Sequence, residues 1–199
     1  ILIGKDAQGG TLPFAERTFI DSGSLLSAKD ISGSSKGGFI ETSGNFLGVA
    51  GEVLAGRGGT WLLDPTNVTI STAAASSTNF TVSSVQSSIN AGTNVTITAD
   101  GTITLSNALT FANSSGTAAT LTLDTSGSGT NASSILLNAG IAATGTSAVN
   151  LVLRSKGAPI STAASTVVDV TGAITIDNTV GLGAGTATSS AGVSLGGTT

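Results

Sequence analysis

The sequence predicts an all-β protein built as a parallel β-helix, a solenoid in which each coil of backbone contributes two or three short strands. Three observations predict it. Short runs alternate apolar and hydroxyl-bearing residues with period two, turn-forming segments rich in Gly, Ser and Asn separate these runs, and paired apolar residues recur along the chain. Amphipathic windows of helical length are missing, so we do not expect a βαβ architecture.

The recurrence is clearest in the second half of the chain. Apolar pairs stand at Val95/Ile97, Leu121/Leu123 and Leu151/Leu153, in steps of 26 and 30 residues. We expect these side chains to point inward and to stack from coil to coil, while the threonines between them point outward. Residues Ile103 and Leu105 are expected to do the same in a neighbouring strand of the first of these coils.

A parallel β-helix would bury these side chains in one core. Each buried aliphatic side chain stabilises the fold by roughly 1.5–3 kcal/mol, and a single coil has no core without its neighbours. The rival arrangement is an antiparallel β-sandwich. Sandwiches usually show aromatic core residues and frequent hairpin signals, whereas this chain is 4% aromatic and has few Asn-Gly or Asp-Gly pairs.

Composition excludes several classes of function. The 199 residues include no Cys and no His, which removes thiolate metal sites, disulfides and the commonest general base. The net charge of −4 gives no general attraction to nucleic acid, so we expect no nucleic-acid partner. No apolar run approaches the roughly 20 residues that span a bilayer as a helix, so we expect no membrane insertion. We expect neither a cofactor nor a metal.

Charge divides the chain into two parts. Residues 1–66 carry 12 of the 18 charged residues, while residues 67–199 are nearly uncharged and repetitive. We interpret the first part as β-helix coils and the second as Thr-, Ser-, Gly- and Asn-rich β-helical repeats that continue them. The chain begins without Met and ends in a Gly-rich run, and we expect it to be a piece of a longer protein.

One segment of the first part is distinctive, and it contains the only Trp. It reads GGFIETSG at residues 37–44, GGTWLLDP at residues 58–65 and NVTI at residues 67–70. This pattern resembles a signature of filamentous haemagglutinin-like exoproteins, which include the high-molecular-weight adhesins of Gram-negative bacteria. The signature residues are Gly37, Gly38, Phe39, Glu41, Gly58, Gly59, Trp61, Leu62, Leu63, Asp64 and Pro65. The repeats that follow are similar to that family's β-helical repeats.

The resemblance implies a right-handed parallel β-helix and export by two-partner secretion through an outer-membrane transporter. It also implies an extracellular, cell-surface location and a non-catalytic role in adhesion, with a receptor that the sequence does not identify. We therefore expect a stiff spacer and display shaft. Two alternatives remain open: a subunit that self-associates into an extracellular fibre, and a polysaccharide-active enzyme.

The signature residues also have direct physical interpretations. The glycine pairs permit tight turns or let coils approach closely. Trp61, with Leu62 and Leu63, is expected to fill a widened core. Asp64 and Pro65 are expected to end a strand, because proline cannot donate to the sheet ladder.

Other candidate sites are weaker. Carboxylates that could form a hydrolytic pair are Glu41, Glu52, Asp64, Asp100, Asp124, Asp169 and Asp177. The calcium-binding repeat and loop motifs are absent, and the uneven steps argue against a flat threonine array for binding ice. Asn-x-Ser/Thr triplets, which are possible glycosylation sites, occur at Asn67, Asn79, Asn94, Asn113 and Asn131.

Overall fold

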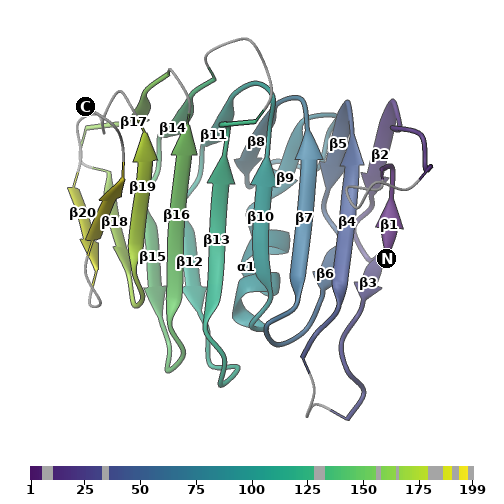
Figure 1. Cartoon of the computed structure of the whole chain (residues 1–199), viewed down its shortest axis with the longest axis horizontal. Coiled ribbons are helices and arrows are strands. Elements are labelled where there is room, and N and C mark those ends of the chain that lie inside the picture. Colours follow the sequence, from purple (N-terminus) through teal and green to yellow (C-terminus); the bar gives the residue numbers. More distant parts are fainter. Residues whose placement is uncertain are drawn as a thin grey trace.

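The computed structural model describes residues 1–5, 11–32, 36–127, 133–155, 158–164, 166–178, 186–189 and 193–196. Every ladder that joins two of its strands is parallel. The fold is a parallel β-helix, as the alternating runs predicted, and the sandwich alternative is wrong. Figure 1 shows the strands of successive coils side by side, with β1 at one end of the solenoid and β20 at the other.

Three faces enclose the core. The first face is an eight-stranded sheet in the order β1 (Leu2–Ile3), β4 (Phe39–Gly44), β7 (Thr60–Pro65), β10 (Asn94–Thr98), β13 (Ala119–Asp124), β16 (Val149–Ser155), β19 (Ile174–Asn178) and β21 (Val193–Gly196). The second face is a seven-stranded sheet in the order β2 (Arg17–Ile20), β5 (Phe46–Val49), β9 (Asn79–Thr81), β8 (Val68–Ser71), β11 (Ile103–Leu105), β14 (Ile135–Leu137) and β17 (Ile160–Thr162).

The third face is broken into two sheets. One pairs β3 (Leu25–Ser27) with β6 (Glu52–Leu54), and the other has the order β12 (Leu109–Ala112), β15 (Ile141–Thr144), β18 (Val167–Val170) and β20 (Thr186–Ser189). The helix α1 (Val82–Asn90) contacts both β6 and β12. In Figure 1, α1 lies behind β10, in the interval between the two sheets of this face.

The core is a column of aligned side chains. Along the first face, consecutive register partners are fully buried, namely Ile40, Trp61, Val95, Leu121, Leu151 and Ile174. The expected stacking of Val95/Ile97 on Leu121/Leu123 and of these on Leu151/Leu153 is confirmed. Ile103 and Leu105 are likewise buried and align with Ile135 and Leu137.

Helix α1 corrects one sequence expectation. The segment Val82–Asn90 was not recognised as helical, yet it buries Val82, Val85 and Ile89 on one side. Its start is capped by Thr81, whose hydroxyl accepts a hydrogen bond from the Ser84 amide. Four of its nine residues are serine, which weakens helix propensity, so the periodicity of the three apolar residues was the only strong signal.

We number the coils by their first-face strands, so that β1 begins coil 1, β4 coil 2, β7 coil 3, β10 coil 4, β13 coil 5 and β16 coil 6. Coil 3 is unlike its neighbours. It consists of β7, β8, β9 and α1, so it supplies two strands to the second face and a helix in place of a strand to the third. The first-face step across this coil, from Trp61 to Val95, is 34 residues, against 26 and 30 for the next two steps.

Candidate functional site

The signature segment forms β4 and β7, which lie side by side on the first face with Ile40 opposite Trp61. Trp61 has no exposed surface, so its predicted position in the core is confirmed. Its indole N–H donates a 2.9 Å hydrogen bond to the hydroxyl of Thr42, which is also fully buried. Each polar group thereby satisfies the other inside an apolar column.

The glycines of the signature let neighbouring coils approach. A Cβ atom at Gly37 would lie 2.1 Å from the carbonyl oxygen of Ala55 in the next corner, and one at Gly59 would lie 2.7 Å from the carbonyl oxygen of Gly38 in the preceding corner. A Cβ atom at Gly38 would lie 3.0 Å from Ala28, and Gly58 forms a turn in which its φ is +67°. Both expected roles of the glycine pairs, close approach and tight turning, are confirmed.

Leucines 62 and 63 alternate as a strand requires. Leu63 is fully buried, as expected, but Leu62 is partly exposed on the outer side, next to Glu41 of β4. The expectation that Leu62 also helps to fill the core is wrong, because alternation along the strand turns it outward. Phe39 begins β4 and is partly buried. Pro65 is the last residue of β7, which confirms that Asp64 and Pro65 end a strand.

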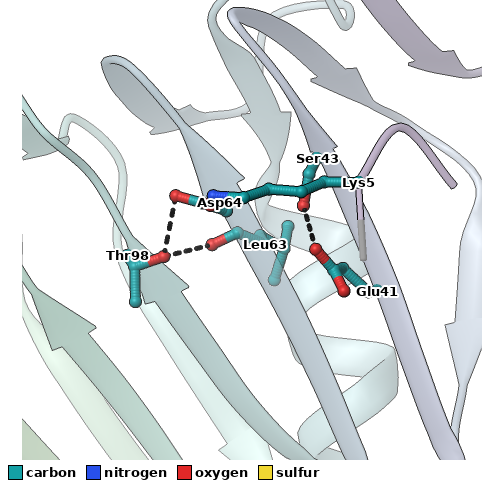
Figure 2. A network of polar contacts seen from close by, with 6 residues as sticks. All are labelled: Lys5, Glu41, Ser43, Leu63, Asp64 and Thr98. Carbon is teal, nitrogen blue, oxygen red and sulfur yellow. Dashed lines mark hydrogen bonds and ion pairs between the residues drawn. The ribbon is translucent and has the colours of Figure 1, made fainter. Parts of the chain in front are cut away.

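Polar side chains gather where the first-face strands end, and Figure 2 shows this network. Lys5 reaches across β4, and its Nζ lies 2.6 Å from Oδ2 of Asp64. The Thr98 hydroxyl lies 3.2 Å from both Asp64 Oδ1 and the carbonyl oxygen of Leu63. Beneath Lys5, the Ser43 hydroxyl donates to Oε1 of the fully buried Glu41 at 2.9 Å.

The surroundings of Lys5 favour its charged form. The hydrogen bond to Asp64 raises the pKa of Lys5 above its usual value, and partial burial opposes this effect. Lys5 Nζ also lies 5.1 Å from the centre of the Phe14 ring, a cation–π contact. The N-terminal segment is thus fastened to coil 3 across the intervening coil 2.

These groups line an open groove of about 550 Å³, which we call the strand-end groove. Its polar lining comes from Lys5, Asp64, Thr66, Thr98, Asp100, Asp124 and Ser126, with Phe14, Pro65, Ala99 and Gly127 completing the walls. Asp124 accepts hydrogen bonds from the amide and hydroxyl of Ser126 and lies 3.8 Å from Arg154 Nη1. Arg154 in turn lies 4.0 Å from Asp177.

The structure separates the candidate carboxylates. Asp64, Asp100 and Asp124 share the strand-end groove, and Glu41 is buried beside it. Glu52 and Asp169 stand on strands of the third face, and Asp177 lies two strands beyond Asp124 on the first. Within the described residues no group of three acidic, His or Cys side chains is placed to hold a metal ion.

The Asn-x-Ser/Thr asparagines differ in environment. Asn79 and Asn113 are buried and donate to main-chain carbonyls, of Ala73 and Ala74 for the former and of Thr117 and Ala148 for the latter. Asn94 bridges neighbouring strands through Gly59 and Thr120. Asn67 is exposed, and its side-chain Oδ1 accepts a hydrogen bond from the Thr102 amide. Asn131 lies outside the described residues.

Sequence reasoning missed most of the groove. Asp64 stood in the signature, but Lys5 is 59 residues away from it and Thr98 is 34 residues away. Only the coil register brings these residues together. A usable signal was that Asp64, Thr98 and Asp124 each follow a run of alternating residues, which puts them at equivalent strand ends.

Among the described residues, no helix has the length and apolar character needed to cross a membrane. No protein-family model, no curated protein and no solved structure matches the chain.

Proposed function

We propose that the chain is a non-catalytic segment of a large secreted bacterial adhesin, in which the β-helix acts as a stiff spacer and surface-display shaft. The observation that carries this proposal is the unbroken core column of the first face, from Ile40 to Ile174. Close-packed interiors resist deformation, so such a column favours a rod. Eight first-face strands at about 4.8 Å spacing give a rod of roughly 34 Å.

The chemistry of the strand-end groove also favours a structural role. A hydrolytic pair needs one carboxylate that is available as a base or nucleophile and one that is a raised-pKa acid. Asp64 is instead held by Lys5 and Thr98, and Asp124 by Ser126 and Arg154. The contacts of Lys5 and Thr98 with Asp64, and of Arg154 with Asp124, join different coils and so support a structural role for these charges.

The resemblance of the segment 37–70 to filamentous haemagglutinin-like exoproteins supports the extracellular and adhesive part of the proposal. So does the composition of the outer surface, where outward threonines and asparagines replace charged side chains. In this proposal an outer-membrane transporter exports the protein, and the receptor is a host or abiotic surface.

A distance measurement tests the shaft. The chain has no Cys, so spin labels can be placed at Leu25→Cys and Val167→Cys, two exposed sites on the third face of coils 1 and 6. We expect a narrow distance distribution centred on an axial separation of roughly 24 Å, five strand spacings, plus the label arms. A broad distribution in the native protein would refute the stiff shaft.

An attachment assay tests the adhesive role. Beads coated with the chain are expected to adhere to epithelial cells or to glass more strongly than beads coated with an unrelated β-helix of similar length. Equal adhesion of the two coatings would refute an adhesive contribution from this segment.

A reducing-sugar assay on a polysaccharide panel tests the enzyme alternative, and release of product that depends on Asp64 or Asp124 would establish it.

A second candidate function is self-association into an extracellular fibre. It is favoured by the exposed apolar side chains of coil 1, which include Leu2, Phe19 and Leu25. Each stands on a strand with a single neighbour among the described residues, respectively β4, β5 and β6. Unpaired parallel edges with apolar residues are templates for pairing. Filaments that lengthen with protein concentration in electron micrographs would favour the fibre, and discrete rods would favour the shaft.

A further inference from the structure

Helix α1 fills the place of a missing strand. The third-face edges of β6 in coil 2 and β12 in coil 4 are separated by one coil, which corresponds to about 9.6 Å, or two strand spacings. An α-helix with its side chains is about 10–12 Å across, so it fits this interval. The edges of both strands would otherwise present unpaired backbone groups.

Side chains of α1 satisfy those edges. The Ser88 hydroxyl donates to the carbonyl oxygen of Val53 in β6 at 2.5 Å. On the other side, Gln86 Nε2 donates to the carbonyl oxygen of Thr110 at 2.5 Å, and Asn90 Oδ1 accepts from the Ala112 amide at 2.7 Å. The helix therefore mimics, with three side chains, the hydrogen bonds that a strand would make with its backbone.

This attachment is weaker than a strand ladder. Helices shorter than about 12–15 residues are marginal alone, and α1 has nine residues. It has no acidic residue in its first turn and no basic residue in its last, so no side-chain charge stabilises its dipole. Ser88 also bonds back to the carbonyl of Ser84, a contact that slightly disfavours helix. Its stability rests on the buried residues Val82, Val85 and Ile89, on the Thr81 cap and on the three edge contacts.

The second face adds an asymmetry at the same coil. Two strands, β8 and β9, stand between β11 and β5, whereas β7 alone stands between β10 and β4. One extra strand spacing of about 4.8 Å on the second face, with faces about 10 Å apart, would incline the coils after coil 3 against those before it by up to roughly 25°. At coil 3 the first face thus has one strand, the second face has two, and the third face has a helix instead of a strand.

We propose that coil 3 is a built-in joint of the β-helix, and that α1 undocks from β6 and β12 in a local opening while the strand ladders on both sides stay intact. This inference rests on the proposed shaft function, because a joint has meaning only in a rod. Undocking would expose two parallel strand edges and remove the link that α1 makes between β6 and β12 on the third face, so the shaft could bend there without unfolding.

Thiol labelling tests the opening, since the chain has no native Cys. Ile89→Cys reports on α1, and Ile97→Cys in β10 is the matched control, because both isoleucines have no exposed surface. We expect the thiol at position 89 to react at least about 100-fold faster than the thiol at position 97 in native buffer. We also expect its rate to depend only weakly on low urea concentrations, as sub-global opening does. Equal rates with equal urea dependence would overturn the proposal.

Two further variants test the mechanism in the Ile89→Cys background. Gln86→Ala removes an edge contact and should raise the labelling rate about fivefold. Ser87→Ala, at the adjacent partly exposed position, should leave it within about twofold. Equal responses would refute the role of the edge contacts.

Hydrogen exchange of the unmodified protein keeps the proposal testable if the Cys variants do not fold. Amides of residues 82–90 should exchange at least about 100-fold faster than those of residues 94–98 and 119–124, and equal protection would overturn the proposal. A failed adhesion assay with fast exchange in α1 would leave the joint standing without the adhesive role. Local opening populates only a small fraction of molecules, so the joint leaves the label distance narrow. A broad label distance would therefore refute the shaft, and slow exchange in α1 would refute the joint.

Discussion

Replacement of Trp61 by Ala is the most direct test of the core column. A buried aromatic side chain removes about 150–250 Å² from water, which at about 25 cal/mol per Å² corresponds to roughly 4–6 kcal/mol. Alanine at position 61 would retain part of this burial free energy. The neighbouring residues Ile40 and Val95 are fixed in strand ladders and cannot move into the cavity that the indole leaves. We therefore expect Trp61→Ala to lower the free energy of unfolding by about 3–5 kcal/mol.

Urea denaturation followed by far-ultraviolet circular dichroism measures this change, because the variant loses the only Trp and thus its fluorescence. Leu62→Ala is the control on the same strand. The Leu62 side chain points outward and is partly exposed, so Leu62→Ala should lower the free energy of unfolding by clearly less than Trp61→Ala does. A Trp61→Ala protein destabilised by less than about 1 kcal/mol would refute the core role.

The hydrogen bond from Trp61 to Thr42 can be isolated with a double-mutant cycle. Thr42→Val leaves the indole N–H buried without a partner, and Trp61→Phe leaves the hydroxyl without one. Each single change should therefore include a penalty of about 1–3 kcal/mol for the unpaired group. The double variant should be more stable than additivity predicts, by about 1 kcal/mol. Additive effects would show that the 2.9 Å contact is not a stabilising bond.

Three other perturbations have defined outcomes. Asn113→Ala should cost about 1–3 kcal/mol in urea denaturation, because the buried amide donates to two main-chain carbonyls. Gly37→Ala should cost more than about 2 kcal/mol, because its Cβ would lie 2.1 Å from a carbonyl oxygen, whereas Gly127→Ala, whose nearest neighbour is at 3.9 Å, should stay within about 0.5 kcal/mol. The stability that protonated Lys5 gains from Asp64 should be lost as pH rises from the ordinary lysine pKa of 10.5 through the raised pKa of Lys5 in the folded protein.

The sign of the pH effect follows from the direction of the shift. A lysine pKa that is higher in the folded state means that folding favours the proton, so stability falls when alkali removes it. Because the Lys5 side chain is 41% exposed, the loss should be small, at most about 1 kcal/mol, and absent from Lys5→Met. Identical alkaline titrations of Lys5→Met and the parent protein would contradict this assignment.

Matched control variants also exist for Asn113→Ala and Gly37→Ala. Asn67→Ala removes an exposed amide and should change stability by less than Asn113→Ala does. Equal costs would mean that burial of Asn113 does not determine its contribution. If Gly37→Ala and Gly127→Ala proved equally stable, the close approach of the coils at Gly37 would not constrain the fold.

Sequence reasoning predicted the parts of the fold that depend on local alternation. Val95, Leu121 and Leu151 stack because inward positions in parallel strands are set by a period of two, which is visible in one dimension. Trp61 was placed in the core because an isolated large residue among strand formers has few other places to go. Helix α1 was missed because its nine residues are held by Val53, Thr110 and Ala112 rather than by their own propensity. The alternating runs place Asp64, Thr98 and Asp124 at equivalent strand ends, but the contact of Lys5 with Asp64 could not be predicted, since these two residues meet only after two coils have formed.

The unequal length of the coils has a practical consequence for protein engineering. Register partners on the first face are separated by 21, 34, 26, 30, 23 and 19 residues between Ile40 and Val193, yet each lands opposite its neighbour. The corners absorb the difference, and lengthening a corner costs little entropy. Foreign epitopes grafted into the turn after Leu105, for example, could be carried in a fixed orientation while the stacked residues beneath them remain as they are.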